Sequence, residues 1–260
     1  MEIVKSIVRV GNSAGVILPR EWLNGKARIE LIEKPLDINK EIFELLSDYL
    51  PDIIGIALVG SYARGEEYSG SDVDVLVITE SINTKIKNGK YEIILISENS
   101  LKKELEINIL PLLPMLKEAK AITNESIFNK YRDSNFSKQN LSFHFNTSLS
   151  AMKLVDSEIK LVKEKNESFV SQSTAYSLIL RLRELYIVDC ILKNEKWSRK
   201  KFLYIVKSVS GSLKSYHIYL SVKESNDNMD KLPIKEAERL YSYIFKEINK
   251  QKESWVKIKK

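Results

Sequence analysis

Residues 53–78 read IIGIALVGSYARGEEYSGSDVDVLVI, and this stretch decides the fold of the middle of the chain. Residues 53–59 are continuously apolar or glycine, which is typical of a strand buried on both faces. A Gly60-Ser61 turn and a polar segment follow, and residues 73–78 then form a second apolar run. The stretch therefore predicts two buried strands joined by a polar connection.

Two acids, Asp72 and Asp74, stand at the start of the second apolar run. On a strand, residues i and i+2 point to the same face, so the two carboxylates are expected side by side. Two close carboxylates repel each other and are costly to bury unless a cation neutralises them. Oxygen ligands favour a hard divalent ion, so the pair predicts a site for Mg²⁺, or Mn²⁺ in its place.

The Gly60-Ser61 turn is a candidate phosphate site. Glycine allows another group to approach the backbone closely, and backbone N–H groups in a turn can hold a phosphate. The Ser61 hydroxyl can add a hydrogen bond. The alternative is an ordinary hairpin with an acidic edge, which explains neither the paired acids nor their distance from the turn.

The complete motif, G-S-x-A-R-G-x(5)-S-D-x-D from Gly60 to Asp74, resembles that of the DNA polymerase β-like nucleotidyltransferase superfamily, particularly its minimal and aminoglycoside-modifying members. The resemblance covers roughly residues 38–130 and implies a mixed sheet flanked by helices. It also implies roles for six residues. These are phosphate binding by Gly60 and Ser61, metal binding by Asp72 and Asp74, a turn or phosphate contact by Arg64, and loop orientation by Ser71.

The superfamily supplies a third carboxylate from a later strand, where it helps to activate the attacking hydroxyl. The corresponding segment here is residues 90–96, in which Glu92 is the single acid. Aligning the segment from its far end instead places Ile94 at the acidic position, with Glu92 about 6–7 Å further along the strand. Glu92 is the candidate, and the alternative is a slow or degenerate enzyme.

Residues 3–33 alternate apolar and polar side chains between turns at Gly11-Asn12 and Asn24-Gly25. This pattern predicts strands at 3–10, 16–18 and 27–33 with a helical turn at 20–23. The order V-R-V-G-N-S-A-G-V-I-L-P-R resembles AbrB/MazE-type swapped-hairpin DNA-binding domains. The resemblance implies a small barrel made by two chains, with DNA contacts from Arg9, Asn12 and Arg20 and, less directly, Lys5. The alternative is a module that only dimerises the chain.

Residues 131–260 show helical spacing and little strand signal, so they predict a helical bundle that holds the acceptor substrate. Arg181 either faces the catalytic cleft or forms an internal ion pair with Glu184, three residues away. The triplet at 199–201 is either a nucleic-acid contact or plain surface. The expected architecture is α+β: a barrel at 1–34, a nucleotidyltransferase core at 35–130 and a bundle at 131–260.

Composition excludes several classes of protein. Hydrophobic residues make up 43% and charged residues 29% of the chain, which is typical of a globular protein rather than a disordered one. The single cysteine excludes an internal disulfide, and no apolar run is long enough for a membrane helix or a signal peptide. We therefore expect a cytoplasmic protein that does not enter a membrane.

Charge is unevenly distributed. Residues 131–260 carry 25 Lys or Arg against 15 Asp or Glu, whereas residues 35–130 carry 10 against 16. An acidic centre beside a basic tail suits a metal site that receives a polyanion, although solvated lysines produce the same imbalance.

The sequence predicts a metal-dependent nucleotidyltransferase that moves a nucleoside monophosphate from an NTP to a hydroxyl or phosphate, with a homodimeric N-terminal module that contacts DNA. Two alternatives remain. One is a DNA-binding transcription regulator or antitoxin whose core senses nucleotides, and the other is a toxin–antitoxin component that nucleotidylates RNA or a partner protein.

Overall fold

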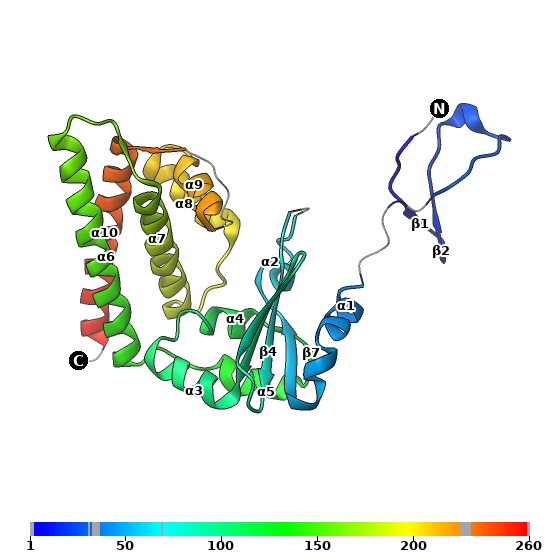
Figure 1. The fold of residues 1–260 in the computed structure, drawn as a ribbon, viewed down its shortest axis with the longest axis horizontal. Coiled ribbons are helices and arrows are strands. Elements are labelled where there is room, and N and C mark those ends of the chain that lie inside the picture. The colour runs from blue at the N-terminus through cyan, green and yellow to red at the C-terminus, as the bar shows by residue number, and fades with distance from the viewer. Residues whose placement is uncertain (1–2, 31, 33–36, 69, 224–229, 259–260) are drawn as a thin grey trace. The chain divides into compact units, whose positions relative to one another are not determined.

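The computed structural model describes residues 3–30, 32, 37–68, 70–223 and 230–258. These residues form two compact units, 1–45 and 46–260, which are described separately. Figure 1 shows the strands and helices of both units. Strands and helices occur together in the larger unit, so the predicted α+β class is confirmed.

The first unit holds a short hairpin. Strand β1 (Val8–Val10) pairs antiparallel with β2 (Ser13–Gly15), and a 3₁₀ turn, Arg20–Trp22, follows. Strand was expected over 3–10 and 16–18; the first observed strand is shorter, and the second lies at 13–15, just before the expected range. The described part of 27–33 is not a strand in the single chain, and no closed barrel is present among the described residues. A swapped barrel takes strands from two chains, so that interpretation stays a prediction.

Helix α1 (Ile38–Leu45) completes the first unit. The second unit opens with a 3₁₀ segment, Ser47–Asp52, that leads directly into the sheet. The backbone changes from α-helix to 3₁₀ geometry here, and Pro51 lies inside the 3₁₀ segment. Proline cannot donate the backbone hydrogen bond that a continuing α-helix needs.

The larger unit contains a five-stranded mixed sheet in the order β5-β6-β4-β3-β7. The strands are β3 (Ile53–Leu58), β4 (Val73–Thr79), β5 (Thr84–Asn88), β6 (Tyr91–Ser97) and β7 (Lys120–Thr123). Strands β4 and β6 run parallel, and the other neighbouring pairs are antiparallel. The buried runs predicted at 53–59 and 73–78 are β3 and β4, and residues 75–78 of β4 are almost inaccessible to solvent.

Four helices belong to this core: α2 (Gly60–Arg64), α3 (Glu98–Ile107), α4 (Leu113–Glu118) and α5 (Glu125–Arg132). Helices α3, α4 and α5 supply apolar side chains that pack with those of β3 and β4 in one cluster, which includes Leu76, Ile78, Leu113 and Phe128. Helix α2 is a single turn between β3 and β4, so it brings the Gly60 turn to the edge of the sheet where β4 begins.

A helical bundle follows, as predicted. Its helices are α6 (Lys138–Glu164), α7 (Gln172–Leu192), α8 (Arg199–Ser210), α9 (Lys214–Lys223) and α10 (Ile234–Ile258). Short strands β8 (Phe169–Val170) and β9 (Leu232–Pro233) pair beside it. The bundle has its own apolar cluster, with Leu178, Leu182, Val206 and Leu240 inside. Helix α9 was not expected from the sequence.

No helix in the described part of the chain is both long enough and apolar enough to cross a lipid bilayer. The domain boundaries at residues 34/35 and 130/131 stay a prediction.

Candidate active site

Asp74 is the centre of the candidate site. It lies in β4, and its backbone carbonyl accepts a hydrogen bond of 3.0 Å from the Val59 N–H at the end of β3. The two strands thereby hold the Gly60 turn against the Asp74 side chain. Gly60 has a φ of +69°, and a Cβ placed on it would lie only 2.1 Å from Asp74 Oδ2. Glycine is therefore required here by both backbone conformation and space.

Asp72 and Glu92 surround Asp74. Asp72 lies two residues before Asp74, just ahead of β4, and Glu92 lies directly opposite Asp74 in the parallel β4–β6 register. Opposed residues of neighbouring strands point to the same face of a sheet, so Glu92 faces the site. Ile94 pairs with Leu76, one full side-chain repeat deeper into the sheet. The register thus brings Glu92, and not Ile94, beside the acidic pair.

Burial raises the pKa of Asp74 to about 6. The negative charges of Glu92 and Asp72 contribute to this increase, while the positive charges of Lys223 and Arg183 act in the opposite direction. Asp72 and Glu92 are thus near enough to act electrostatically on Asp74, and so are two cations of the helical bundle, Lys223 and Arg183. This accumulation of carboxylates in a partly buried place fits a divalent cation.

Within the described ranges, no three His, Cys, Asp or Glu side chains are close enough to hold a metal ion unaided. Mg²⁺ is ordinarily held by one or two carboxylates, with substrate phosphates and water as its remaining ligands. The Asp72–Asp74 pair fits that donor set. Glu92 is also engaged by Lys87, whose Nζ lies 3.0 Å from Glu92 Oε1.

Glu118 fixes the turn from the other side. The Gly60 N–H donates to Glu118 Oε1 at 2.6 Å, and Arg64 Nη1 lies 2.6 Å from Glu118 Oε2. Burial raises the pKa of the Glu118 carboxyl, and the charge of Arg64 counteracts that effect. Because the Gly60 N–H is occupied, the Ser61 hydroxyl is the open donor of the turn, with no hydrogen bond to any residue in the described ranges.

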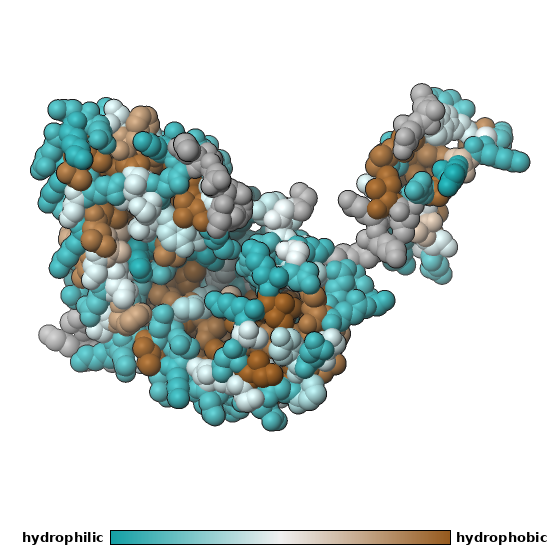
Figure 2. Space-filling view, in the orientation of Figure 1, coloured by the Kyte–Doolittle hydropathy of each residue, from teal (hydrophilic) through white to brown (hydrophobic). Residues whose placement is uncertain are grey.

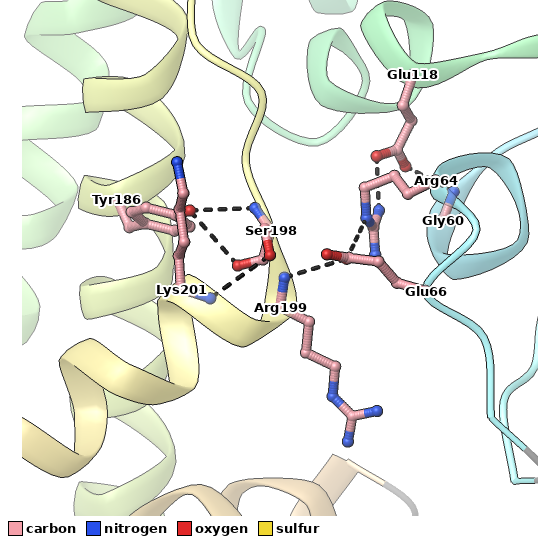
Figure 3. Close-up of polar contacts among 8 residues, drawn as sticks. All are labelled: Gly60, Arg64, Glu66, Glu118, Tyr186, Ser198, Arg199 and Lys201. Carbon is pink, nitrogen blue, oxygen red and sulfur yellow. Dashed lines mark hydrogen bonds and ion pairs between the residues drawn. The ribbon is translucent and has the colours of Figure 1, made fainter.

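Arg64 joins the core to the bundle. Its Nε lies 2.9 Å from Glu66 Oε2, and its guanidinium carbon lies 3.6 Å from the centroid of the Trp197 ring. Glu66 Oε2 also accepts a hydrogen bond of 3.1 Å from the Arg199 N–H (Figure 3). Burial opposes ionisation of Glu66, but hydrogen bonds from Ser198, Arg64 and Arg199 prevail and lower its pKa.

Ser71 shapes the loop before the acids. The Ser71 hydroxyl accepts a hydrogen bond of 2.9 Å from the Tyr68 N–H, and the Ser71 N–H donates to the Tyr68 carbonyl at 2.8 Å. The side chain therefore stabilises the turn that leads to Asp72. This position agrees with the loop-orienting role that the resemblance implies.

Arg181 and Arg183, both on α7, have different partners. Arg181 forms an ion pair with Glu184, with Nη1 and Oε2 2.6 Å apart, so the internal-pair alternative describes it. Arg183 is the one whose charge acts on Asp74, and its guanidinium lies 5.9 Å from the Trp197 ring centroid. Lys223 at the end of α9 and Glu118 were missed by sequence reasoning, because their partners lie far away in the chain.

The residues proposed for DNA binding all lie in the first unit. Arg9 is in β1 and its Nε donates to the Gly11 carbonyl at 3.0 Å, while Asn12 is in the turn after β1 and Arg20 begins the 3₁₀ turn. The three side chains are exposed, as is Lys5. No nucleic acid is present to test them, so their roles stay predictions.

Comparison with known proteins now identifies the class of enzyme. Residues 39–132 match the nucleotidyltransferase domain family. A protein of Methanocaldococcus jannaschii named "putative protein adenylyltransferase" is 38% identical over 80 residues, which cover 31% of this chain and 77% of that protein. The chain belongs to the nucleotidyltransferase family, and the predicted enzyme class is confirmed.

Two solved structures are more distant. Spectinomycin adenyltransferase AAD(9) from Enterococcus faecialis, solved with ATP and spectinomycin, is 15% identical with a TM-score of 0.43, over 81% of this chain and 98% of that one. A nucleotidyltransferase-like protein from Exiguobacterium sibiricum is 14% identical with a TM-score of 0.35, over 82% of this chain and 74% of that one.

Proposed function

We propose that the enzyme transfers a nucleoside monophosphate from a nucleoside triphosphate to an acceptor hydroxyl and releases pyrophosphate. The observation that carries the proposal is the position of Asp74, packed against Gly60 and opposite Glu92 in the β4–β6 register. A carboxylate in this place has a pKa raised to about 6 by burial and neighbouring acids, which a divalent cation would reverse.

Asp72 and Asp74 would hold Mg²⁺ or Mn²⁺. When bound, such an ion neutralises charge on the phosphates and aligns the reacting oxygens. The Ser61 hydroxyl donates to a phosphate oxygen beside the Gly60 turn, while Arg64 and Ser71 keep the loops on either side of the acids in place. Glu118 assists by holding Gly60 and Arg64 together.

Arg183 and Lys223 of the bundle bind the triphosphate. Both are near enough to act electrostatically on Asp74, and a cation near the metal-binding acids suits the negative charge of a triphosphate. Arginine suits this task because its planar guanidinium can donate two parallel hydrogen bonds to phosphate oxygens. The core and the bundle thus contribute opposite charges to one site.

Glu92 acts as the general base. Its carboxylate accepts the proton of the acceptor hydroxyl, whose oxygen then attacks the α-phosphorus in line with the departing pyrophosphate. Lys87, on the edge strand β5, forms an ion pair with Glu92.

ATP is the proposed nucleotide. The Methanocaldococcus jannaschii relative is named for adenylyl transfer, and its similarity to this chain covers 77% of its length. That name includes a protein acceptor, whereas the helical bundle of this chain lies outside the residues that match the family. The acceptor is therefore treated separately below.

A second proposal concerns residues 1–34, which we assign to homodimerisation and DNA contact by Arg9, Asn12 and Arg20. The supporting observation is that the unit leaves apolar side chains exposed: Val4 is 75% exposed and Ile17 70%. Figure 2 shows apolar residues at the surface of this unit. A second copy would cover them. DNA contact by this unit is also compatible with the alternative that the protein is a transcription regulator.

The test is incubation of the full chain with each of four α-labelled NTPs, Mg²⁺ or Mn²⁺, and pooled cellular RNA or protein. Label should pass from ATP to an acceptor in the wild type and be lost in Asp72→Asn and in Asp74→Asn. Transfer at the wild-type rate in both variants, with melting curves showing a folded protein, would sink the assignment.

A further inference from the structure

One segment of the bundle has only positive charge. Residues 196–223 contain seven Lys or Arg and no Asp or Glu. The seven are Lys196, Arg199, Lys200, Lys201, Lys207, Lys214 and Lys223. The segment includes all of α8 and α9, and it lies outside residues 39–132, which match the family. Of these seven residues, the proposed nucleotide site uses Lys223.

Helix α8 has a buried side and an exposed side, and lysines lie on the exposed one. Phe202, Val206 and Ser210 are buried on its inner face. Lys200, Tyr204 and Lys207 are spaced four and three residues apart and therefore share the outer face. All three are exposed, and Tyr204 reaches 75% exposure. We call Lys200, Lys201, Tyr204 and Lys207 the α8 face.

The lysines of the α8 face are not neutralised within the protein. Among the residues that the structure describes, none of the three forms an ion pair with a carboxylate. Other exposed lysines of the bundle do have acidic partners: Lys160 pairs with Asp156, and Lys193 pairs with Asp189. The α8 face thus combines lysines that have no ion pair with a segment in which no acid stands nearby in the sequence, so its positive charge is available to an outside anion.

The α8 face begins beside the active site. Arg199, the first residue of α8, donates its N–H to Glu66 Oε2 at 3.1 Å, and its guanidinium lies 4.4 Å from the Tyr68 ring centroid. Figure 3 shows this joint between α8 and the loop that follows the Gly60 turn. Helix α8 has 12 residues and is therefore about 18 Å long, so a polymer bound along it would extend about 18 Å from the Arg199–Glu66 contact. One end of such a polymer can therefore reach the site while the rest lies on α8.

We propose that the α8 face binds single-stranded RNA and presents a terminal ribose hydroxyl to the site. Lysines along one side suit the phosphates, and an exposed aromatic ring among them suits stacking by an unpaired base. An acidic protein would satisfy the lysines but would leave Tyr204 without a role. This inference rests on the proposed nucleotidyl transfer and names its acceptor.

The reaction then balances as follows. The ribose oxygen forms a bond to the α-phosphorus of ATP, and the bond from that phosphorus to the bridging oxygen of pyrophosphate breaks. Pyrophosphate leaves with the electron pair of the broken bond, and the hydroxyl proton passes to Glu92. The product is RNA extended by one AMP through a phosphodiester bond.

The test compares two triple variants of the full chain. Lys200→Ala/Lys201→Ala/Lys207→Ala removes the α8 lysines, and Lys85→Ala/Lys103→Ala/Lys153→Ala removes three exposed lysines elsewhere. The two variants have the same net charge as each other, because each loses three lysines, and both retain the N-terminal unit. The probe is a fluorescent, unstructured oligouridylate, with a duplex RNA and a single-stranded DNA of equal length beside it, measured by anisotropy over a range of KCl.

We expect the α8 variant to bind the oligouridylate at least tenfold more weakly, with the slope of log K against log salt reduced by about 2 for three lost single-strand contacts. The control variant should bind as the wild type does. Tyr204→Ala should weaken binding about fivefold or more, and Tyr204→Phe should restore it because the ring is kept.

Equal affinities in the two triple variants would overturn the proposal, as would tighter binding of duplex RNA or of single-stranded DNA than of the oligouridylate. Metal-dependent ATP binding is measured on the same samples. Intact ATP binding without RNA binding refutes the α8 proposal alone, while wild-type protein that binds no ATP refutes the nucleotidyl-transfer proposal.

Discussion

In the proposed mechanism, Glu92 is the residue on which the rate of transfer depends most directly. A base that accepts the proton of the acceptor hydroxyl acts in the transition state and does not hold ATP. Glu92→Gln should therefore lower kcat by about 100-fold or more and leave the Kd for ATP within about twofold. Single-turnover kinetics with labelled ATP, alongside ATP titrations, measure the two quantities.

Glu98 provides the matched control for Glu92. It begins the helix after the same strand, but it is engaged with Lys130 and Tyr131, which hold its pKa at about 2. Glu98→Gln should keep the wild-type kcat. If Glu92→Gln turned over as fast as the Glu98 variant, the base would have to be another group.

His144 should make stability depend on pH. Burial, and then the positive charge of Arg181, lower its pKa to about 4, and neither ring nitrogen has a hydrogen-bond partner in the described structure. An unfolded histidine titrates near pH 6.5, so between pH 6.5 and 4 the unfolded chain binds a proton that the folded chain does not. The free energy of unfolding must fall as pH falls through this window.

His144→Leu should remove up to about 3 kcal/mol of this dependence. Urea unfolding at pH 7.5, 6.0 and 5.0 measures it, and the exposed His217→Gln provides the control. Carboxylates contribute equally to all three proteins, so the difference between them isolates His144. Parallel stability curves for the wild type and His144→Leu would contradict the assignment.

At the scale of an element, the short helix α2 requires glycine at position 60 for two reasons, its backbone angle and the lack of space for a side chain. Gly60 has a φ of +69°, and a Cβ on it would lie 2.1 Å from Asp74 Oδ2. Gly65, at the other end of the same turn, has the same φ but nothing within 4 Å of its added Cβ. Substitutions at Gly60 and Gly65 therefore distinguish the cost of backbone strain from the cost of a steric collision.

Gly65→Ala should cost about 1 kcal/mol, the price of a left-handed alanine. Gly60→Ala should cost about 3 kcal/mol and abolish transfer, because Asp74 must also move. Urea unfolding and the transfer assay measure both effects. Similar losses of stability and activity in the two variants would show that only the backbone angle matters.

The buried strands of the core could be predicted from local sequence patterns. Buried strands β3 and β4 were predicted because continuous apolar runs and the Gly60 turn are local signals. A strand was predicted at β6, but two alignments with the acidic position were left open, since pairing with β4 is decided by distant contacts. The register is what removes the ambiguity between Glu92 and Ile94.

The direction of side chains on α7 could not be predicted for a related reason. Leu178 and Ile187, nine residues apart, lie on opposite sides of this helix and both are buried, so its sequence has no single apolar face to set the rotation. The sequence therefore did not indicate that Arg183, and not Arg181, acts on Asp74. The Glu118–Arg64 pair joins residues 54 positions apart, which no local pattern encodes.

At the scale of the whole molecule, residues 1–45 and 46–260 are separate compact units. The first unit leaves Ile17, Leu23 and Ile29 about 70% exposed, an unusual amount of apolar surface for so short a segment. About 30 residues cannot bury a sufficient core alone. We therefore expect the enzyme to be a homodimer held together by two copies of this unit.

Light scattering should give twice the 30.0 kDa mass of one chain. Deleting residues 1–34 should yield a monomer that still transfers AMP, because the deletion ends before α1 and leaves the larger unit whole. Ile17→Asp/Ile29→Asp should likewise give a monomer, since a buried unpaired charge is costly. Leu154→Asp, at a position on α6 that is 74% exposed, should remain a dimer.

DNA binding, if it occurs through Arg9, Asn12 and Arg20, should depend on this dimer. Two linked copies double the number of phosphate contacts, so affinity should fall steeply as salt rises and should be lost in Ile17→Asp/Ile29→Asp. Gel shifts at low and high salt measure this. A dimer that retards no DNA at low salt would leave residues 1–34 as a dimerisation device, and a full-length monomer would exclude the swapped barrel altogether.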